Sequence, residues 1–448
     1  MNFCRGGLRE PIDPQEATVR GQRKTRLWRG AVIVNLALTA TLAGQVVSAA
    51  DPDGTLGPDV VVFELPSTYN WGEDGGLRAY SVGTTSCNRG DAPLDWISNT
   101  NEHPVIAQNL YRVTVPDPPA EHGRIEMLGM SWLKHGFLSV NGSYCDSCQQ
   151  PPMGGSQLGV GCSDPYSSSL NGSQSRLGPR SEVNAFTGYF DYPNSIPTGS
   201  STLAGRLLVD ATEVINDPVH YRYFVEGQYV APDDAAAGNG LNNASHREVL
   251  VSGTSLLTTG ATEEGWPAIY AWQTVDPSVT VREVPVPGEG LFIVASKASD
   301  NLDGTWRYDY AVFNLNSHLS GRSFSVPIEA DTVITDPWFR DVDYHSGEPY
   351  DGTDWPLTLD TGSGWATWAT DDFATDPNAN ALRWSTMYSF GFDADSPPES
   401  ALASLGLYRS GGPPSVSVLV SAPATNLIPL FVDGFETGDT SAWGAVAP

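Results

Sequence analysis

Hydrophobic and polar residues alternate along most of the chain beyond residue 50. Residues 306–313 (WRYDYAVF) place aromatic and aliphatic side chains at every second position, and residues 382–390 (LRWSTMYSF) repeat the pattern. A period of two is typical of antiparallel strands with one buried face. Further strands are expected at 59–65, 105–115, 124–130, 219–230, 268–273, 279–286, 290–297, 322–328, 332–335, 364–369, 403–408 and 415–421. No long segment beyond residue 50 carries a helical stripe, so the chain is predicted to be all-β.

A Ser/Thr/Gly-rich stretch, Ser252 to Thr262, interrupts this pattern and marks the expected domain boundary. Residues 51–252 combine cysteines with long irregular loops, whereas residues 263–424 show short strands at the spacing of a two-sheet sandwich. We therefore predict an irregular disulfide-bonded β domain followed by an antiparallel, Ig-like β-sandwich.

The first 50 residues have the pattern of a secretory signal peptide. Basic residues between Arg20 and Arg29 precede an apolar run, Ala31 to Val47, and the small residues Ser48-Ala49-Ala50 follow it. The run is short and is broken by polar residues, so it does not predict a membrane span. The protein is expected to be secreted or held at the bacterial cell surface, with no integral membrane span after cleavage.

The exported chain is strongly acidic. Removal of residues 1–50 leaves 17 basic and 49 acidic residues, a net charge of −32. Such a charge disfavours nucleic acid and anionic membranes as partners, because both require a cationic surface. It favours solubility, and the binding of cations at clustered carboxylates.

Four cysteines remain in the exported chain: Cys87, Cys145, Cys148 and Cys162. An even number in an exported protein predicts two disulfides. The preferred pairing is Cys145–Cys148 with Cys87–Cys162, and the other two pairings stay open. A four-thiolate zinc site is the alternative, although only one close cysteine pair is present. A redox-active CxxC is a third interpretation, but Pro151 and Pro152 follow it and no helix is indicated.

Histidines are the candidates for catalysis or transition-metal binding. The chain has no H-x-H or HExxH pair, so a site would have to be assembled from distant strands. His103, His135 and His220 lie in polar–aromatic segments, with Glu226 near His220 in one predicted strand. These four residues are the candidate site.

Acidic residues crowd the loop DVDYHSGEPYDGTDW (341–355). Oxygen ligands at this density favour Ca²⁺, although the spacing is not that of an EF-hand. The candidate calcium ligands are Asp341, Asp343, Glu348, Asp351 and Asp354. The loop's aromatic residues equally favour a surface that binds a sugar or a partner.

Several blocks are similar to segments of uncharacterised exported bacterial proteins. They are GTTSCN (83–88), NEHPVIAQN (101–109), SWLKHGF (131–137), GCSDPYSS (161–168) and YFVEGQYV (223–230). Residues 425–448 contain DGFETGDTSAW, which resembles the tail that closes many secreted bacterial proteins. The resemblance implies export and a shared first domain, and for the tail a role in sorting or surface retention. An edge strand at 430–432 is the competing interpretation of the tail.

Two functional hypotheses follow. The first is a calcium-stabilised, disulfide-bonded β-protein of the cell surface or extracellular space, which binds a glycan or another cell-surface component. The alternative is a secreted metal-dependent enzyme that acts on an extracellular polymer through the histidines of its first domain. The first is favoured because no catalytic spacing is present.

Overall fold

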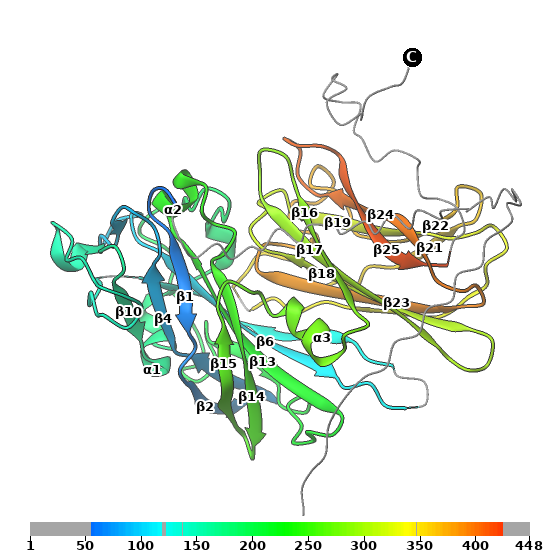
Figure 1. Ribbon diagram of the computed structural model, residues 1–448, viewed down its shortest axis with the longest axis horizontal. Helices are drawn as coiled ribbons and strands as arrows, with labels where there is room; N and C mark the ends of the chain where they lie inside the picture. Colours follow the sequence, from blue (N-terminus) through cyan, green and yellow to red (C-terminus); the bar gives the residue numbers. More distant parts are fainter. Residues whose placement is uncertain (1–54, 119–121, 137, 346, 424–448) are drawn as a thin grey trace, which may run out of the picture. The chain divides into compact units, whose positions relative to one another are not determined.

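The structure is a computed structural model, and it describes residues 55–118, 122–136, 138–345 and 347–423. The predicted signal peptide (1–50) and the predicted sorting tail (425–448) lie outside the described residues. Almost all regular structure is antiparallel β (Figure 1), which confirms the all-β prediction. Among the described residues, no helix is long and apolar enough to cross a membrane.

Strands up to residue 263 form three sheets. A three-stranded sheet has the order β1-β4-β10, and a pair of short strands joins β5 to β9. A larger sheet runs β15-β14-β13-β6-β7-β12-β3-β2, with β8 and β11 paired beside β6. The bounds of these strands are β1 Val60–Glu64, β2 Thr68–Asp74, β3 Leu77–Val82, β4 Thr84–Asn88, β5 Leu94–Asp95, β6 Val105–Thr114, β7 Ile125–Met130, β8 Leu133–His135, β9 Gln157–Leu158, β10 Ser163–Tyr166, β11 Leu177–Gly178, β12 Leu207–Asp210, β13 Tyr221–Val230, β14 Ala244–Ser252 and β15 Ser255–Glu263.

The two outer strands of the larger sheet approach each other through side chains. Thr68 of β2 donates its hydroxyl to the carbonyl oxygen of Leu256 in β15 at 2.5 Å. Asn70 Nδ2 donates to the carbonyl oxygen of Thr254 at 2.6 Å. An open strand edge can pair with another chain. These two contacts occupy the carbonyl oxygens of Leu256 and Thr254 at the β15 edge.

The strands after residue 279 form a sandwich of two five-stranded sheets, as predicted (Figure 1). Their orders are β16-β17-β18-β23-β20 and β21-β22-β19-β24-β25. Aromatic side chains join the two sheets: Tyr310 packs on Phe324 with ring centroids 5.5 Å apart, and Trp368 stacks on Phe392 at 5.8 Å. The bounds are β16 Thr280–Pro285, β17 Leu291–Asp300, β18 Trp306–Asn314, β19 Gly321–Pro327, β20 Ile334–Arg340, β21 Leu357–Asp360, β22 Trp365–Ala369, β23 Thr386–Ala394, β24 Glu399–Leu407 and β25 Ser415–Ala422.

The central strands β6 and β13 are buried on both faces. In β6, Ile106 and Leu110 belong to the core of the first sheets, whereas Tyr111 and Val113 belong to the core of the sandwich. Alternate residues of a strand point to opposite faces, so one strand serves two cores. The larger sheet is therefore packed directly against the sandwich.

Helices are few and short. The described helical segments are η1 Gly154–Ser156, α1 Ser168–Asn171, η2 Gln174–Arg176, η3 Arg180–Glu182, α2 Pro232–Ala237 and α3 Ile269–Val275. The strand predicted at 268–273 is wrong, because these residues form α3. Ile269 and Trp272, three positions apart, are both fully buried, which fits one face of a helix. A short apolar run has the same composition in a buried strand and in a buried helix.

Residues 252–262, expected to separate two domains, also have regular structure. Most of them form β15, which pairs with β14 from Ser252 opposite Ser255 to His246 opposite Glu263. The change from the first sheets to the sandwich falls between Glu263 and Thr280, where α3 lies.

The disulfides join Cys87 to Cys145 and Cys148 to Cys162, so the preferred pairing was wrong. The reason is a long-range backbone contact. Gly142 and Ser163 exchange two backbone hydrogen bonds, of 2.8 and 2.9 Å, so that the loop after residue 142 returns along β10. The two cysteines of the CxxC segment consequently meet different partners.

Digestion with an Asp-specific protease under non-reducing conditions tests this pairing, because cleavage before Asp146 separates Cys145 from Cys148. We expect mass spectrometry to detect one peptide pair linking 87 to 145, and the single peptide 146–163 with an internal bridge between 148 and 162. The loops close over sequence separations of 58 and 14 residues. Replacing both cysteines of a bridge by alanine should therefore lower the free energy of unfolding by about 4 kcal/mol for Cys87–Cys145 and about 3 kcal/mol for Cys148–Cys162. A peptide pair linking residues 145 and 148 would contradict the assignment.

A second prediction concerns Asp164 of β10, which is fully buried. Burial raises the pKa of its carboxyl to about 7, although the backbone N–H of Val140 opposes this by donating to Oδ1 at 2.7 Å. The folded state then binds the proton more tightly than the unfolded state, so stability falls as the pH rises from about 4 to 7. Asp164→Asn cannot titrate. Its stability relative to the wild type should increase between pH 5 and pH 8 by about 2.6 kcal/mol.

Urea unfolding at both pH values measures this effect. Asp371→Asn, which changes an exposed carboxylate, is the matched control. Equal pH dependence in all three proteins would show that Asp164 is ionised in the folded state throughout this range.

Candidate functional site

Two of the predicted site residues lie together. His103 Nε2 is 3.1 Å from His135 Nδ1, and Phe190 packs edge-on against both rings. His135 ends β8, and the segment before β6 carries His103 against it. Both side chains are buried, and burial lowers the pKa of His103 to about 4 and that of His135 to about 3. The pair is therefore neutral at pH 7, with one ring donating an N–H hydrogen bond to the other.

The other two predicted residues lie elsewhere. His220 is exposed and pairs with Asp217, whose Oδ2 lies 2.7 Å from its Nδ1. Glu226 is fully buried in β13. The structure therefore does not assemble His103, His135, His220 and Glu226 into one site. In the described part of the chain, no three His, Cys, Asp or Glu side chains are placed to hold a metal ion.

Glu226 belongs to a buried polar network instead. Its Oε1 accepts from Asn109 Nδ2 at 2.7 Å and from the hydroxyl of Tyr111 at 2.9 Å, and its Oε2 accepts from the backbone N–H of Ala268 at 2.6 Å. Arg180 completes the network by donating to Asn109 Oδ1 at 2.8 Å. Burial raises the pKa of Glu226, and these donors counteract that effect. The network satisfies buried groups and does not open to solvent.

The five predicted calcium ligands are used in different ways. Glu348 accepts from the backbone N–H groups of Arg180 and Ser181, at 2.5 and 3.2 Å. Asp351 accepts from the backbone N–H of Thr353. Asp341 accepts from the side chain of Asn380, and burial raises the pKa of this aspartate to about 6. Asp343 and Asp354 are exposed. Calcium binding at this loop stays a prediction from its composition.

A groove lined mainly by charged and polar residues lies where β6 and β7 meet the sandwich. We call it the arginine groove. It has a volume of about 310 Å³, and its lining consists of Arg112, Thr114, His122, Gly123, Arg124, Glu126, Tyr221, Arg307 and Asp309.

Strand register brings the first charges together. Arg112 of β6 stands directly opposite Glu126 of β7, and its Nη2 lies 2.6 Å from Glu126 Oε2. Arg124, two residues before Glu126 and so on the same face, binds Glu126 Oε1 at 3.0 Å. The sequence pattern contained this signal, since Arg124 and Glu126 flank an apolar residue in one predicted strand and Arg112 lies between apolar residues in the other. It was missed because a charge in a strand is usually solvated.

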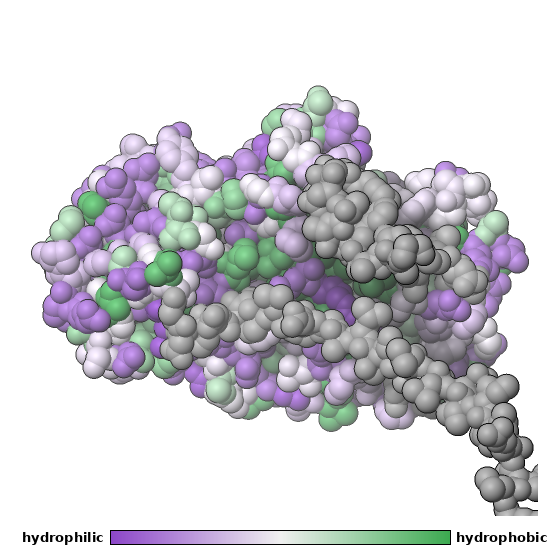
Figure 2. Space-filling view, turned by 45° about the horizontal axis from the view of Figure 1, so that its top comes forward, coloured by the Kyte–Doolittle hydropathy of each residue, from purple (hydrophilic) through white to green (hydrophobic). Residues whose placement is uncertain are grey.

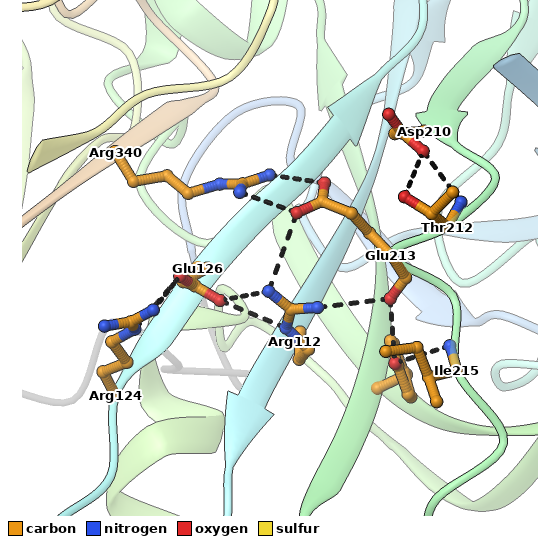
Figure 3. A network of polar contacts seen from close by, with 9 residues as sticks. Arg112, Arg124, Glu126, Asp210, Thr212, Glu213, Ile215 and Arg340 are labelled. Atoms are coloured by element: carbon orange, nitrogen blue, oxygen red, sulfur yellow. Dashed lines mark hydrogen bonds and ion pairs between the residues drawn. The ribbon is translucent and has the colours of Figure 1, made fainter. Parts of the chain in front are cut away.

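The ion pairs continue away from the groove. Arg112 also lies 3.7 Å from Glu213, which binds Arg340 at 2.6 Å. Figure 3 shows the five side chains as an unbroken chain of alternating charges, from Arg124 through Glu126, Arg112 and Glu213 to Arg340. Burial alone would raise the pKa of Glu126, but Arg124 and Arg112 outweigh it and lower the pKa of this carboxyl.

The sandwich supplies the opposite wall of the groove. Arg307 of β18 binds Asp309 Oδ1 and Asp393 Oδ1, both at 3.1 Å. The guanidinium groups of Arg124 and Arg307 lie 4.3 and 5.7 Å from the ring of Trp338. Burial raises the pKa of Asp309 although Arg307 opposes it. The groove thus combines planar cationic groups with aromatic surface.

No family model and no curated protein matches this chain. Among solved structures, it has weak likenesses to "Enterococcal surface protein, partial N-terminal region" (9% identity, 81% of this chain and 94% of that chain, TM-score 0.17). A second likeness is to "Biofilm associated protein - B domain" (9% identity, 82% of this chain and 87% of that chain, TM-score 0.14). Neither is close enough to indicate a shared fold or function.

The chain of charges leads to a stability prediction. The side chain of Glu126 is 3% exposed and neutralises two arginines. Glu126→Gln removes the nearest counter-charge of both cations, leaving Arg112 only the more distant Glu213, and should cost about 3 kcal/mol of unfolding free energy in urea titrations at pH 7. Glu73→Gln is the control, because Glu73 pairs with Arg78 but is 46% exposed, and it should cost about 1 kcal/mol or less. Similar losses in both variants would contradict a special role for the buried pairs.

Proposed function

We propose that the chain is an extracellular or cell-surface binding protein that holds an acidic glycan in the arginine groove. The observation that carries this proposal is the gathering of Arg112, Arg124 and Arg307 at one groove. The chain beyond residue 50 has a net charge of −32. With Glu213, Asp393 and Arg340, which bind these residues from outside the lining, four arginines meet four carboxylates, so an anion at the groove does not meet the acidic excess of the chain as a whole.

Donors remain for a ligand. Arg124 uses Nε and Nη2 on Glu126, and its side chain is 40% exposed. A guanidinium has five N–H donors in one plane, a geometry that suits a carboxylate. We therefore assign Arg124 the main contact with the ligand, and the more buried Arg112 and Arg307 a supporting electrostatic role.

The same groove suits a sugar ring. Tyr221 lines it, with the Arg112 guanidinium 5.1 Å from the ring centroid, and Trp338 lies beside Arg124 and Arg307. Aromatic faces and a few directed polar groups are a usual composition for ligand sites. Figure 2 shows a mainly hydrophilic face with smaller hydrophobic areas, as expected for an exported soluble protein. Nucleic acid is the less favoured polyanion because it requires an extended cationic surface, whereas these arginines are confined to one groove of about 310 Å³.

Isothermal titration with oligogalacturonate tests this function. We expect the wild type to bind it, and to bind the fully methyl-esterified oligomer much more weakly, because esterification removes the charge and keeps the sugar. Arg124→Ala should lower the affinity by roughly tenfold, the worth of a hydrogen bond between charged groups. Arg282→Ala is the control, since Arg282 is exposed and does not line the groove.

Two results would overturn the proposal. One is equal binding of the charged and esterified oligomers. The other is an equal loss of affinity in the Arg124 and Arg282 variants, which would reduce the effect to net charge. Melting temperatures of both variants establish that they are folded.

A further inference from the structure

A second groove, chemically opposite to the first, lies between β12, the segment before it, and the 341–345 loop. We call it the acid-edged groove. Its floor is apolar and includes Leu128, Met130 and Leu208, and its rim carries the carboxylates of Asp210 and Asp343. Its volume is about 410 Å³, which is within the range of roughly 300–1,000 Å³ usual for small-molecule sites.

Backbone geometry explains why Leu208 contributes to this floor. Leu207 and Val209 of β12 are buried in the core of the first sheets, so Leu208 between them points to the opposite face. Leu208 pairs in register with Met130, and Gly129 lies beside that pair. A Cβ atom at Gly129 would come within 1.8 Å of the carbonyl oxygen of Leu208. Only glycine therefore permits the close approach of the two strands that form the floor.

The rim of the groove, unlike its apolar floor, is acidic. Asp210 and Asp343 are both exposed, and the residues that line the groove include no Lys or Arg. Asp210 is held in place, because its Oδ1 accepts from the backbone N–H and the hydroxyl of Thr212, at 2.8 and 2.7 Å. These bonds lower the pKa of Asp210, so it is anionic at neutral pH. A ligand that complements the groove needs an apolar body and a cationic end.

We propose that the acid-edged groove binds a small aliphatic amine, with its alkyl chain on the floor of Leu128, Met130 and Leu208 and its ammonium group beside Asp210 and Asp343. Charge complementarity selects this class, since an apolar acid would meet two carboxylates and a simple metal cation would make no use of the floor. This proposal is independent of glycan binding at the arginine groove.

Calorimetric titration with octylamine tests the proposal, with butylamine and octanol as matched ligands. We expect octylamine to bind more tightly than either, because butylamine covers less of the floor and octanol lacks the charge. Asp210→Asn with Asp343→Asn should weaken octylamine binding by about fivefold, the worth of two partly exposed ion pairs, and leave octanol binding unchanged. Leu208→Ser should weaken the binding of octylamine and octanol alike.

The control is the double variant Asp331→Asn with Asp371→Asn, which removes the same charge from exposed positions outside the groove. If it weakens octylamine binding as much as the groove variant does, the amine is responding to net charge and the proposal is overturned. Equal affinity for octylamine and octanol overturns it as well, as does undetectable octylamine binding at millimolar concentration. Melting temperatures distinguish loss of the site from loss of the fold.

Discussion

Burial of polar side chains in strands that have no solvent-facing side is the constraint on which the structure depends. Both β6 and β13 are covered on both faces, yet they carry Asn109 and Glu226, which are fully buried. An unpaired buried carboxylate is very costly, so its donors have to be present and correctly oriented. They come from β6, from the start of α3 and, through Asn109, from Arg180.

This requirement couples the first sheets to the sandwich. Arg180 donates to the backbone carbonyl of Ser385 at 2.9 Å, next to the first residue of β23, and Asn109 donates to the same carbonyl at 3.1 Å. A shift of the sandwich relative to β6 would break several of these bonds at once. The arginine groove depends on the same alignment, because Arg112 and Arg124 come from one side of it and Arg307 from the other.

Much of the architecture was predictable because it depends on local alternation. The strands expected at 105–115 and 306–313 appear at 105–114 and 306–314. The alternation did not predict β2, which lies at a sheet edge and is mostly polar. It predicted a strand where α3 lies, because a short apolar run fits a buried strand and a buried helix equally well. The cysteine pairing depends on a backbone contact between Gly142 and Ser163, which cysteine spacing does not encode.

The candidate site residues, too, were predictable only in part. Polar–aromatic context singled out His103 and His135, and they are neighbours, but the same reasoning chose His220, which is exposed outside that cluster. To predict the arginine groove from the sequence, one would need the register between β6 and β7 and the position of β18 beside them. The sequence pattern of a single strand contains neither. Its members looked like solvated charges because the partners that desolvate them lie far away in the sequence.

The two grooves are electrostatically connected through Arg340. It binds Glu213, which continues to Arg112 in the arginine groove, and its charge also acts on the rim of the acid-edged groove, where it favours the ionised form of Asp210. An anion in one groove and a cation in the other therefore face opposite ends of one charge chain. The five charges alternate and both ends are arginines, so the chain presents a positive charge to each groove: Arg124 attracts an anion directly, whereas Arg340 acts by keeping the rim carboxylate of Asp210 ionised.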